Sequence, residues 1–493
     1  MSREIQSRQF AAVALAMLLV HPDFAQLLPD DVRAEMDAKA ISQLFPHRID
    51  TGRHVGVGDK PALAYYDQIQ GPGAQWMRLY FSEYDLGAGS FIILTAPDGA
   101  EQRLDAHNIG ASRGWSAFFN GDTVSIALYV APEDAGVFVA SPGAIAGRFA
   151  PSPVGDVPDL QLRTLCGPDD RVASTNSRVC RITFFDGVTL SPGCTGWLVS
   201  NGGMLTAGHC VDFDPDGNGP MVPDGTVEAV FLNGIVEFNV PASQANGTPV
   251  IAAPQDQFPI NAVNAFGFGG EDETIGDDFA VFTINVNATT GENAHLTKGY
   301  FRVTRETPLN NETIRVTGFG TDNTPTGTTG GDNAQTLTNQ TSTGPYQGES
   351  SGPLFSHSYQ TDTTGGNSGS PIIWEAQSVT IGIHTNAGCT SAGTGANAGT
   401  SFEMDALENA LNGFAGPSPT HVDQFMPLLA LEDGTVFRPW LWLPAGAAAV
   451  ADGGTLVIVG GDYTRAAGNV FTMGADGRAF MVVAPVGNVV IGD

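Results

Sequence analysis

Short apolar runs separated by turn residues are the feature that most constrains this chain. Runs at 76–81, 90–94 and 123–130 are bounded by breaks that contain Gly, Pro or Asn-Gly. Such breaks recur about every ten residues between 55 and 145, which predicts a small antiparallel β-sandwich. The chain has 62 Gly, 31 Pro and only 15% charged residues. This composition extends the turn-rich β character to the whole chain and excludes an all-helical protein.

Length and local composition predict three folded units. At ~150 residues per domain, the 493 residues suggest roughly three domains. The stretch 141–163 is rich in Pro, Gly and Ala without a sustained period, so it predicts a linker. Helices are predicted only near 31–45 and at 404–411. The assignment is a signal peptide at 1–26, a β-sandwich pro-region or accessory domain at 27–150, a linker at 151–165, a central domain at 166–414 and a small β-rich domain at 415–493.

The charge balance restricts the partners. The chain has 22 Lys+Arg against 52 Asp+Glu, which gives a formal net charge of −30. A polyanion is bound through cationic side chains. We therefore expect neither nucleic acid nor an anionic membrane surface as a partner.

The N-terminus has the order of a secretory signal. Arg3 and Arg8 precede an apolar run at 10–20, and small residues follow near Ala25. A run of this length is too short to span a bilayer, which takes ~20 apolar residues. A buried N-terminal helix is the alternative. We expect a soluble protein that is secreted, with the periplasm as a second possible location, and export favours disulfides among the five cysteines.

The central block contains a histidine, an aspartate and a serine in the order of a nucleophilic triad. His209 follows an apolar strand, Asp278 precedes one, and Ser368 stands among glycines. A serine hydroxyl is a weak nucleophile and needs a base within hydrogen-bond reach. A buried carboxylate holds that base in one tautomer. The backbone N–H groups of Gly366 and Ser368 are predicted to form an oxyanion hole, which typically contributes ~3 kcal/mol per donor.

Two other interpretations of these residues are weaker. An α/β-hydrolase would run Ser, Asp, His and show Gly-x-Ser-x-Gly. In this chain the last position of that motif is Ser370, so both requirements fail. Each residue alone is more often structural, and only the combination predicts catalysis.

The segments around the triad resemble the trypsin-like serine proteases. Cys-Thr-Gly-Trp at 194–197, Thr-Ala-Gly-His-Cys at 206–210 and Gly-Asn-Ser-Gly-Ser-Pro at 366–371 carry the resemblance, which covers roughly 165–411. It implies an all-β protein in which two orthogonal six-stranded β-barrels enclose the site, flanked here by the two smaller β domains.

The resemblance also implies a role for each triad residue. It carries His209 over as general base, Asp278 as its orienting acid and Ser368 as nucleophile. Asp277 competes with Asp278, but the Asp-aromatic-Ala pattern of the family falls on 278–280.

Within this clan the bacterial glutamyl endopeptidases match best. Their Thr-Thr-Gly-Gly-Asn-Ser-Gly-Ser-Pro stands unchanged at 363–371, and 381–386 resembles the strand that lines their specificity pocket. The resemblance implies that His384 and Thr363 bind the carboxylate of a substrate. A charge-assisted hydrogen bond of this kind is worth roughly 2 kcal/mol. The alternative is that His384 is a barrel histidine without substrate contact.

The chain departs from the wider family at two places. Trypsin-type enzymes have an acid just before the serine that pairs with the new N-terminus, and Asn367 stands there in this chain. The activation switch must therefore differ. The 69 residues from His209 to Asp278 are a long excursion, which leaves substrate access and extended subsite preference open.

The cysteine pairs are inferred from the resemblance. It implies a Cys194–Cys210 bridge and, as in lysyl endopeptidases, a Cys166–Cys389 bridge, which would leave Cys180 as the odd thiol. A Cys166–Cys180 pair is the rival connectivity.

One acidic loop has the spacing of a calcium site. Asp212, Asp214 and Asp216 precede Gly217, but Pro223 stands where the bidentate Glu is expected. An acidic solvated loop is the alternative. We predict no required cofactor and no metal, with calcium at this loop as the exception to test.

The flanking units carry weaker resemblances. The region 71–132 is similar to the β-sandwich propeptides of lysyl endopeptidases, which implies a zymogen whose pro-region assists folding or blocks the cleft. A permanent accessory domain is the alternative. The unit at 415–493 is similar to turns of a β-solenoid and equally to a small β-sandwich.

These observations predict a secreted serine endopeptidase that acts on protein or peptide substrates and prefers Glu or Asp before the cleaved bond. One alternative keeps the mechanism and changes the specificity. The other is a binding or adhesion protein on a protease scaffold.

Overall fold

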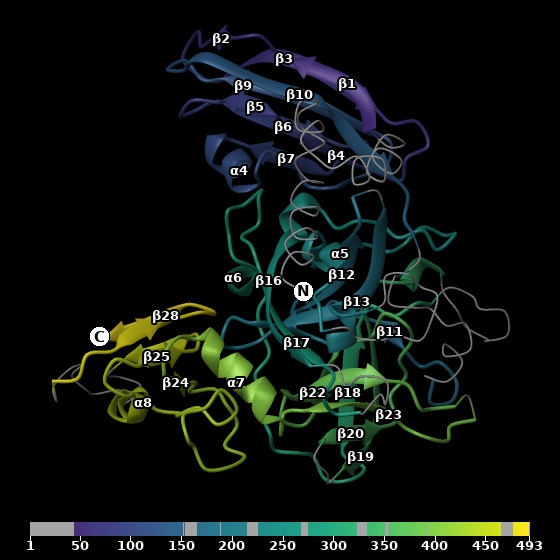
Figure 1. Ribbon diagram of the computed structural model, residues 1–493, viewed down its shortest axis with the longest axis vertical. Coiled ribbons are helices and arrows are strands. Elements are labelled where there is room, and N and C mark those ends of the chain that lie inside the picture. The colour runs from purple at the N-terminus through teal and green to yellow at the C-terminus, as the bar shows by residue number, and fades with distance from the viewer. Residues whose placement is uncertain are drawn as a thin grey trace, which may run out of the picture.

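A computed structural model describes residues 44–150, 152, 165–187, 189–213, 225–267, 275–322, 333–350, 354–390, 392–464 and 477–492. In Figure 1 an N-terminal β domain lies above two β-barrels, and a C-terminal unit lies beside the lower barrel. The predicted signal peptide at 1–26 and most of the predicted linker lie outside the described residues. Within the described residues no helix is long and apolar enough to cross a membrane.

The N-terminal domain is the expected β-sandwich. One sheet contains β1 (Leu44–Asp50), β2 (His54–Val55), β4 (Trp76–Tyr80), β5 (Glu83–Asp85), β8 (Phe119–Asn120) and β10 (Ala135–Gly147). The other contains β3 (Ala62–Gln70), β6 (Phe91–Thr95), β7 (Glu101–Leu104) and β9 (Thr123–Val130). Every second residue of β9 is buried, as expected for a strand with one face on a core. Leu79 and Val139 of the first sheet and Leu94 and Ile126 of the second share that core.

Two predictions about local structure are wrong. The residues 141–147 are not linker but the second half of β10, which pairs with β1 and β4 on its two sides. Its small residues, such as Ala144 and Ala146, are buried there, so backbone pairing prevails over the turn-forming composition. The helix predicted near 31–45 lies outside the described residues except for its last two positions, where strand β1 begins.

The second error concerns the number of helices. The helix predicted at 404–411 is present as α7 (Asp405–Phe414). The further short helices are α4 (Ala106–Ala111), α5 (Ala229–Leu232), α6 (Ala294–Thr297) and α8 (Leu443–Ala449). Four to seven residues give too little apolar periodicity to be recognised in sequence.

Two closed antiparallel barrels form the centre of the molecule, as predicted. The first contains β12 (Val179–Phe185), β13 (Leu190–Leu198), β14 (Met204–Thr206), β17 (Phe279–Ile284), β16 (Gln257–Gly267) and β15 (Ile235–Glu237). The second contains β19 (Gln340–Glu349), β18 (Thr313–Gly318), β21 (Pro371–Trp374), β22 (Val379–Asn386), β23 (Asn397–Ser401) and β20 (Ser356–Tyr359), and it closes through β19–β20. Strand β11 (Val172–Ala173) extends one edge of β19.

One apolar cluster joins the two barrels. Trp197, Leu205 and Val281 of the first barrel pack in it with Ile373 and Ile383 of the second. The segments after β14, before β17 and before β21 therefore meet at a fixed seam. These three segments carry the predicted triad.

The N-terminal domain docks on the first barrel through paired amides. The Gln257 side chain accepts from the Phe118 N–H at 2.9 Å and donates to the Phe118 carbonyl at 2.8 Å. The Asn120 side chain accepts from the Ile251 N–H at 2.8 Å and donates to the Ile251 carbonyl at 3.0 Å. A buried apolar cluster surrounds these contacts, formed by Trp76, Phe118, Ile145, Phe185, Leu190, Ile235 and Ile251.

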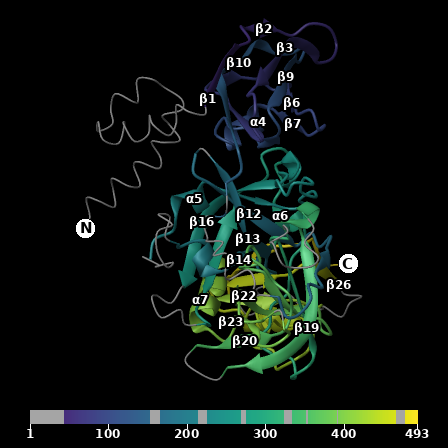
Figure 2. The same cartoon turned by 90° about the vertical axis from the view of Figure 1, so that its right-hand side faces the viewer.

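This docking surface lies at the end of the first barrel away from the triad. Strand β17 starts directly after Asp278, and the chain beyond its other end reaches Thr289, whose carbonyl accepts from Asn108 of the N-terminal domain. The six residues of β17 span ~20 Å. Figures 1 and 2 both show the N-terminal domain on the side of the first barrel opposite to the second barrel.

The C-terminal unit is built from parallel strands. β24 (Pro419–Val422), β25 (Thr455–Ile458) and β27 (Met481–Val483) form one sheet, and β26 (Gly461–Thr464) pairs with β28 (Val489–Gly492). Successive parallel strands in two sheets are the arrangement of solenoid turns rather than of a hairpin-connected sandwich.

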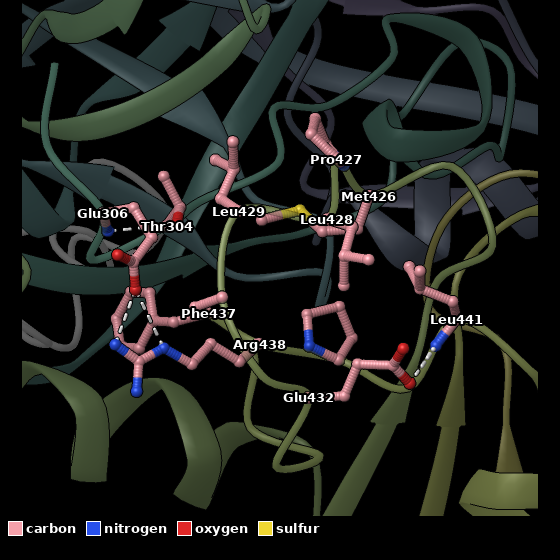
Figure 3. A pocket seen from close by; sticks show the side chains of 12 residues that line it. Thr304, Glu306, Met426, Pro427, Leu428, Leu429, Glu432, Phe437, Arg438 and Leu441 are labelled. Atoms are coloured by element: carbon pink, nitrogen blue, oxygen red, sulfur yellow. Dashed lines mark hydrogen bonds and ion pairs between the residues drawn. The ribbon is translucent and has the colours of Figure 1, made fainter.

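Two ion pairs hold the C-terminal unit on the central domain. Arg302 pairs with Asp423 at 2.5 Å, and Arg438 pairs with Glu306 at 2.6 Å. Figure 3 shows the second pair at a pocket along this seam, beside Phe437 and Leu429. No triad residue lines this pocket.

Candidate active site

His209 and Asp278 are joined by two hydrogen bonds. The His209 Nδ1 lies 2.6 Å from Asp278 Oδ2, and the His209 backbone N–H donates to Asp278 Oδ1 at 3.0 Å. Both residues are 5% exposed. The histidine lies in the tight turn Gly208–Cys210 after β14, where a Cβ on Gly208 would stand 1.9 Å from the Gly267 carbonyl. Asp278, and not the competing Asp277, therefore fixes both the backbone and the ring of this histidine.

Ser368 stands in a tight turn between the barrels. It is half-buried, whereas its neighbours Asn367 and Gly369 are buried. Its carbonyl accepts from the Thr195 N–H at 2.9 Å and lies 3.8 Å from Cys210 Sγ, next in sequence to His209. The serine turn is thus fixed against the histidine loop, and Ser368 stays partly accessible within it.

The residues before Ser368 form a tight turn whose backbone is fixed by its neighbours. Gly366 has φ +100°, and a Cβ there would lie 2.4 Å from the Phe319 carbonyl, so only glycine fits. The Gly365 carbonyl accepts from the Thr321 N–H at 2.8 Å, and the Gly366 carbonyl accepts from Thr195 Oγ1 at 2.9 Å. Within the described residues, the N–H groups of Gly366 and Ser368 have no hydrogen-bond acceptor.

Asn367 closes this turn in place of the acid of trypsin-type enzymes. Its Oδ1 accepts from the Thr364 N–H at 3.0 Å, and its own N–H donates to the Thr364 carbonyl at 3.0 Å. In this chain a neutral amide therefore closes the turn locally.

His384 is buried on β22 beside the serine turn. Its backbone N–H donates to the Ser370 carbonyl and its carbonyl accepts from the Gly369 N–H, both at 2.8 Å. Its Nδ1 lies 2.6 Å from the hydroxyl of Tyr359 on β20. Burial, with a contribution from the nearby charge of His209, lowers the pKa of His384 to about 3. The ring is therefore neutral at neutral pH.

Thr363 lies fully buried next to this histidine strand. Its hydroxyl accepts from Asn397 Nδ2 at 3.1 Å, so its own proton remains to be donated. Asn397 also donates to the Thr361 carbonyl and accepts from the Gly388 and Cys389 N–H groups. Tyr359 and Asn397 were missed by the sequence analysis because they come from other strands and belong to no local motif.

The cysteines pair as the resemblance implies. Disulfides join Cys194 to Cys210 and Cys166 to Cys389, and Cys180 is a buried free cysteine. The rival pairing of Cys166 with Cys180 is absent. Burial raises the pKa of the Cys180 thiol well above its usual value, which keeps it protonated.

The predicted calcium loop is only partly described. Asp214 and Asp216 lie outside the described residues, and Asp212 is buried with Oδ2 accepting from the Gly225 N–H at 2.9 Å. The part of the chain that the structure describes contains no group of three His, Cys, Asp or Glu that could hold a metal. Calcium at this loop stays a prediction.

Comparison with known proteins identifies the central domain. Residues 194–383 match the trypsin-like peptidase domain family, and this range contains His209, Asp278 and Ser368. The match covers less than half of the chain, and it makes this central domain similar to the trypsin-like serine peptidases. The domain is therefore a serine endopeptidase, which acts on peptide bonds of proteins or peptides.

Relatives of this peptidase are distant. The glutamyl endopeptidase of Bacillus licheniformis is 24% identical over 277 residues, which cover 51% of this chain and 69% of the relative. A solved structure of a Glu endopeptidase in complex with MPD is 21% identical with a TM-score of 0.35, covering 51% of this chain and 99% of the other. The protease Anisep from Arthrobacter nicotinovorans is 17% identical with a TM-score of 0.35, covering 50% and 99%.

Proposed function

We propose that this peptidase is secreted and cleaves peptide bonds that follow Glu or Asp. The observation that carries the specificity is His384, a buried neutral histidine on the strand that pairs with the serine turn. The curated relative from Bacillus licheniformis is a glutamyl endopeptidase, which agrees with this preference. The signal-like N-terminus and the two disulfides support export.

The chemistry proceeds through an acyl-enzyme. His209 removes the proton of the Ser368 hydroxyl as Oγ attacks the carbonyl carbon, and the N–H groups of Gly366 and Ser368 stabilise the negative oxygen. His209 then donates the proton to the leaving amine, and water repeats the cycle on the ester. Asp278 stabilises the imidazolium formed in both steps through its 2.6 Å contact. No cofactor is required.

A neutral His384 binds a carboxylate only if its outward nitrogen carries the proton. The Tyr359 hydroxyl has one proton, and its two acceptors are His384 Nδ1 at 2.6 Å and the Ala398 carbonyl at 3.2 Å. When the Tyr359 hydroxyl donates to Nδ1, the histidine proton lies on Nε2, where it can bind a carboxylate oxygen. The Thr363 hydroxyl supplies a second donor.

The test is a comparison of fluorogenic peptides that differ only in Glu, Asp, Gln or Ala before the cleaved bond. We expect kcat/KM for Glu to exceed that for Gln. His384→Leu should lower the Glu value about 30-fold, equivalent to roughly 2 kcal/mol, and leave the Ala value within about threefold. Tyr359→Phe should give a smaller loss of the same kind.

Two outcomes contradict parts of the proposal. Equal cleavage after Glu and Gln by the wild-type protein would leave the serine peptidase and remove the acidic specificity. Equal losses for all four peptides in His384→Leu would show that this histidine supports the barrel only.

A further inference from the structure

The serine turn needs an anchor other than a new N-terminus. In this chain Asn367 replaces the acid that such an N-terminus would pair with, and the closure it makes with Thr364 is local. Contacts from Thr195 hold the turn on the side of the first barrel, whereas the Asn367 closure does not hold it on the side of Thr321. A buried charged group that reaches this turn from elsewhere in the chain would supply the missing anchor.

Arg171 is that group. Its Nη1 donates to Thr364 Oγ1 at 2.7 Å and to the Thr321 carbonyl at 2.9 Å. Its side chain is 4% exposed. The Thr364 hydroxyl itself donates to the same Thr321 carbonyl at 2.8 Å, so the three groups form a closed hydrogen-bonded triangle. Arg171 and Thr364 are 193 residues apart in sequence.

The guanidinium is held in place from its other side. The Asp169 carboxylate accepts hydrogen bonds from Arg171 Nε at 3.0 Å and from Nη2 at 2.6 Å. The Asp322 carboxylate lies 3.4 Å from the same Nη2. A bidentate pair of this kind orients the guanidinium plane. Gln340 Oε1 accepts from Nη1 as well, at 3.1 Å.

The segment that carries Arg171 is fixed to the second barrel. The Cys166 N–H and the Asp170 N–H donate to the two oxygens of Asp362 at 2.6 and 2.8 Å. The Cys166–Cys389 disulfide adds a covalent tie. All these anchors are internal groups of the chain, and none of them is a free α-ammonium.

Thr321 belongs to this triangle and also contacts the turn that carries the predicted oxyanion donor Gly366. The Thr321 carbonyl receives Arg171, and the Thr321 N–H donates to the Gly365 carbonyl. In a trans peptide the carbonyl and the following N–H point in opposite directions. Holding the Gly365 carbonyl on Thr321 therefore directs the Gly366 N–H to the opposite side of this peptide, as an oxyanion donor requires.

We infer that Arg171 is a positioning residue for the oxyanion hole, which it holds through Thr364 and Thr321. The inference rests on the proposed roles of Gly366 and Ser368. Without the guanidinium the Gly365–Gly366 peptide loses its support and can rotate. One oxyanion donor is then lost in the transition state, whereas the binding of the substrate side chain at His384 is unchanged.

The main test uses Arg171→Met, which keeps most of the side-chain volume and removes every donor. We expect kcat to fall about 100-fold, as for loss of one oxyanion donor, with KM within about threefold. Arg171→Lys should be intermediate, because an ammonium cannot copy the fork of the guanidinium. The matched control is Arg305→Met, which removes a half-buried Arg–carboxylate pair, to Glu408, away from the turn. Its kcat should stay within about twofold of wild type.

A second readout separates positioning from general support. A peptide aldehyde forms a tetrahedral adduct that needs the oxyanion hole, whereas a product peptide with a C-terminal Glu binds without one. Arg171→Met should weaken the binding of the aldehyde by about the same factor as it lowers kcat. The affinity for the product peptide should stay unchanged. Thr364→Val, which removes one corner of the triangle, should give a smaller change of the same pattern and replaces Arg171→Met if that variant does not fold.

The outcomes distinguish this inference from the proposed function. Unchanged kcat in a folded Arg171→Met, or equal weakening of the aldehyde and the product peptide, would overturn it. If the wild-type protein cleaves without preference for Glu, the inference is tested with its best substrate and stands or falls independently. If the wild-type protein neither cleaves nor reacts with a fluorophosphonate, the proposed roles of the triad and the oxyanion hole fail first.

Discussion

At the scale of single residues, the two neighbouring aspartates give the sharpest contrast. Asp278 holds the ring and the backbone of His209, whereas Asp277 is half-buried one residue earlier. A histidine that loses its carboxylate settles in the wrong tautomer for accepting the serine proton. Asp278→Asn should therefore lower kcat by roughly 10⁴-fold, the effect of the same change in the enzymes that define this triad.

Asp277→Asn is the matched control for this prediction. It should change kcat less than about threefold, because the triad contacts belong to Asp278. Both variants are compared by steady-state kinetics and by the rate of fluorophosphonate labelling, with circular dichroism to verify folding. Similar losses in the two variants would show that the negative charge of the loop, rather than the Asp278 contacts, matters.

At the scale of elements, His357 links three strands of the second barrel. It lies fully buried on β20, its Nδ1 is 2.9 Å from the Tyr346 hydroxyl on β19, and its Nε2 is 2.9 Å from the Ile381 carbonyl on β22. Burial lowers the pKa of His357 to about 4. The barrel therefore folds around a neutral ring that stays neutral until the solution is strongly acidic.

This burial makes the stability of the barrel depend on pH. The unfolded histidine has a pKa near 6.5, so below that pH the unfolded state binds a proton that the folded state rejects. The destabilising effect of the buried His357 is absent above pH 6.5. Between pH 6.5 and 5 it lowers the free energy of unfolding by about 2 kcal/mol. His357→Gln should remove this loss, whereas His107→Gln, at an exposed position, should keep it.

Urea unfolding of the three proteins at pH 5 and 7 measures the effect. The difference between His357→Gln and wild type cancels the contributions of all other groups. An identical pH dependence in these two proteins would mean that the ring is protonated inside the barrel.

Two strands of the N-terminal domain show where the residue pattern predicted the observed element and where it did not. The alternation at 123–130 predicted β9 correctly, because one face of that strand lies on a core. The residues 141–147 have no such alternation and were assigned to a linker. They are a strand because β1 and β4 pair with both of their edges, and Pro142 lies between the stretches of β10 that pair with β5 and β4.

At the scale of the whole molecule, the N-terminal domain lies away from the triad. Its amide pairs with Gln257 and Ile251 are at the end of the first barrel opposite to Asp278. We therefore expect that cutting the chain within 153–164 neither releases this domain nor raises activity. The buried apolar cluster around Trp76 and Phe185 should keep the two pieces together without the covalent connection.

The experiment is limited proteolysis of the linker followed by size-exclusion chromatography and kinetics. The pieces should co-elute, with kcat/KM within about twofold of that of the uncut chain. A version with Phe118→Asp and Ile251→Asp, which places two charges in this apolar cluster, should separate after the cut and serves as the control for docking. A large rise in kcat/KM on cutting would instead assign the domain the blocking role that its resemblance to propeptides implies.

The sequence alone determined the chemistry-bearing residues and the β class. His209, Asp278, Ser368 and the glycines of the serine turn are readable because each answers a local requirement of backbone conformation or residue type. The alternation of apolar runs with turn residues fixed the β-rich class for the same reason, since strand periodicity is local.

Only the tertiary structure decided which distant residues support that chemistry. Tyr359 reaches His384 across a barrel, and Arg171 reaches Thr364 over 193 residues. The choice between Cys389 and Cys180 as partner of Cys166, and the parallel pairing in the C-terminal unit, were settled in the same way. These contacts depend on strand register and on barrel closure, which bring together residues with no relation in sequence, so no local pattern can encode them.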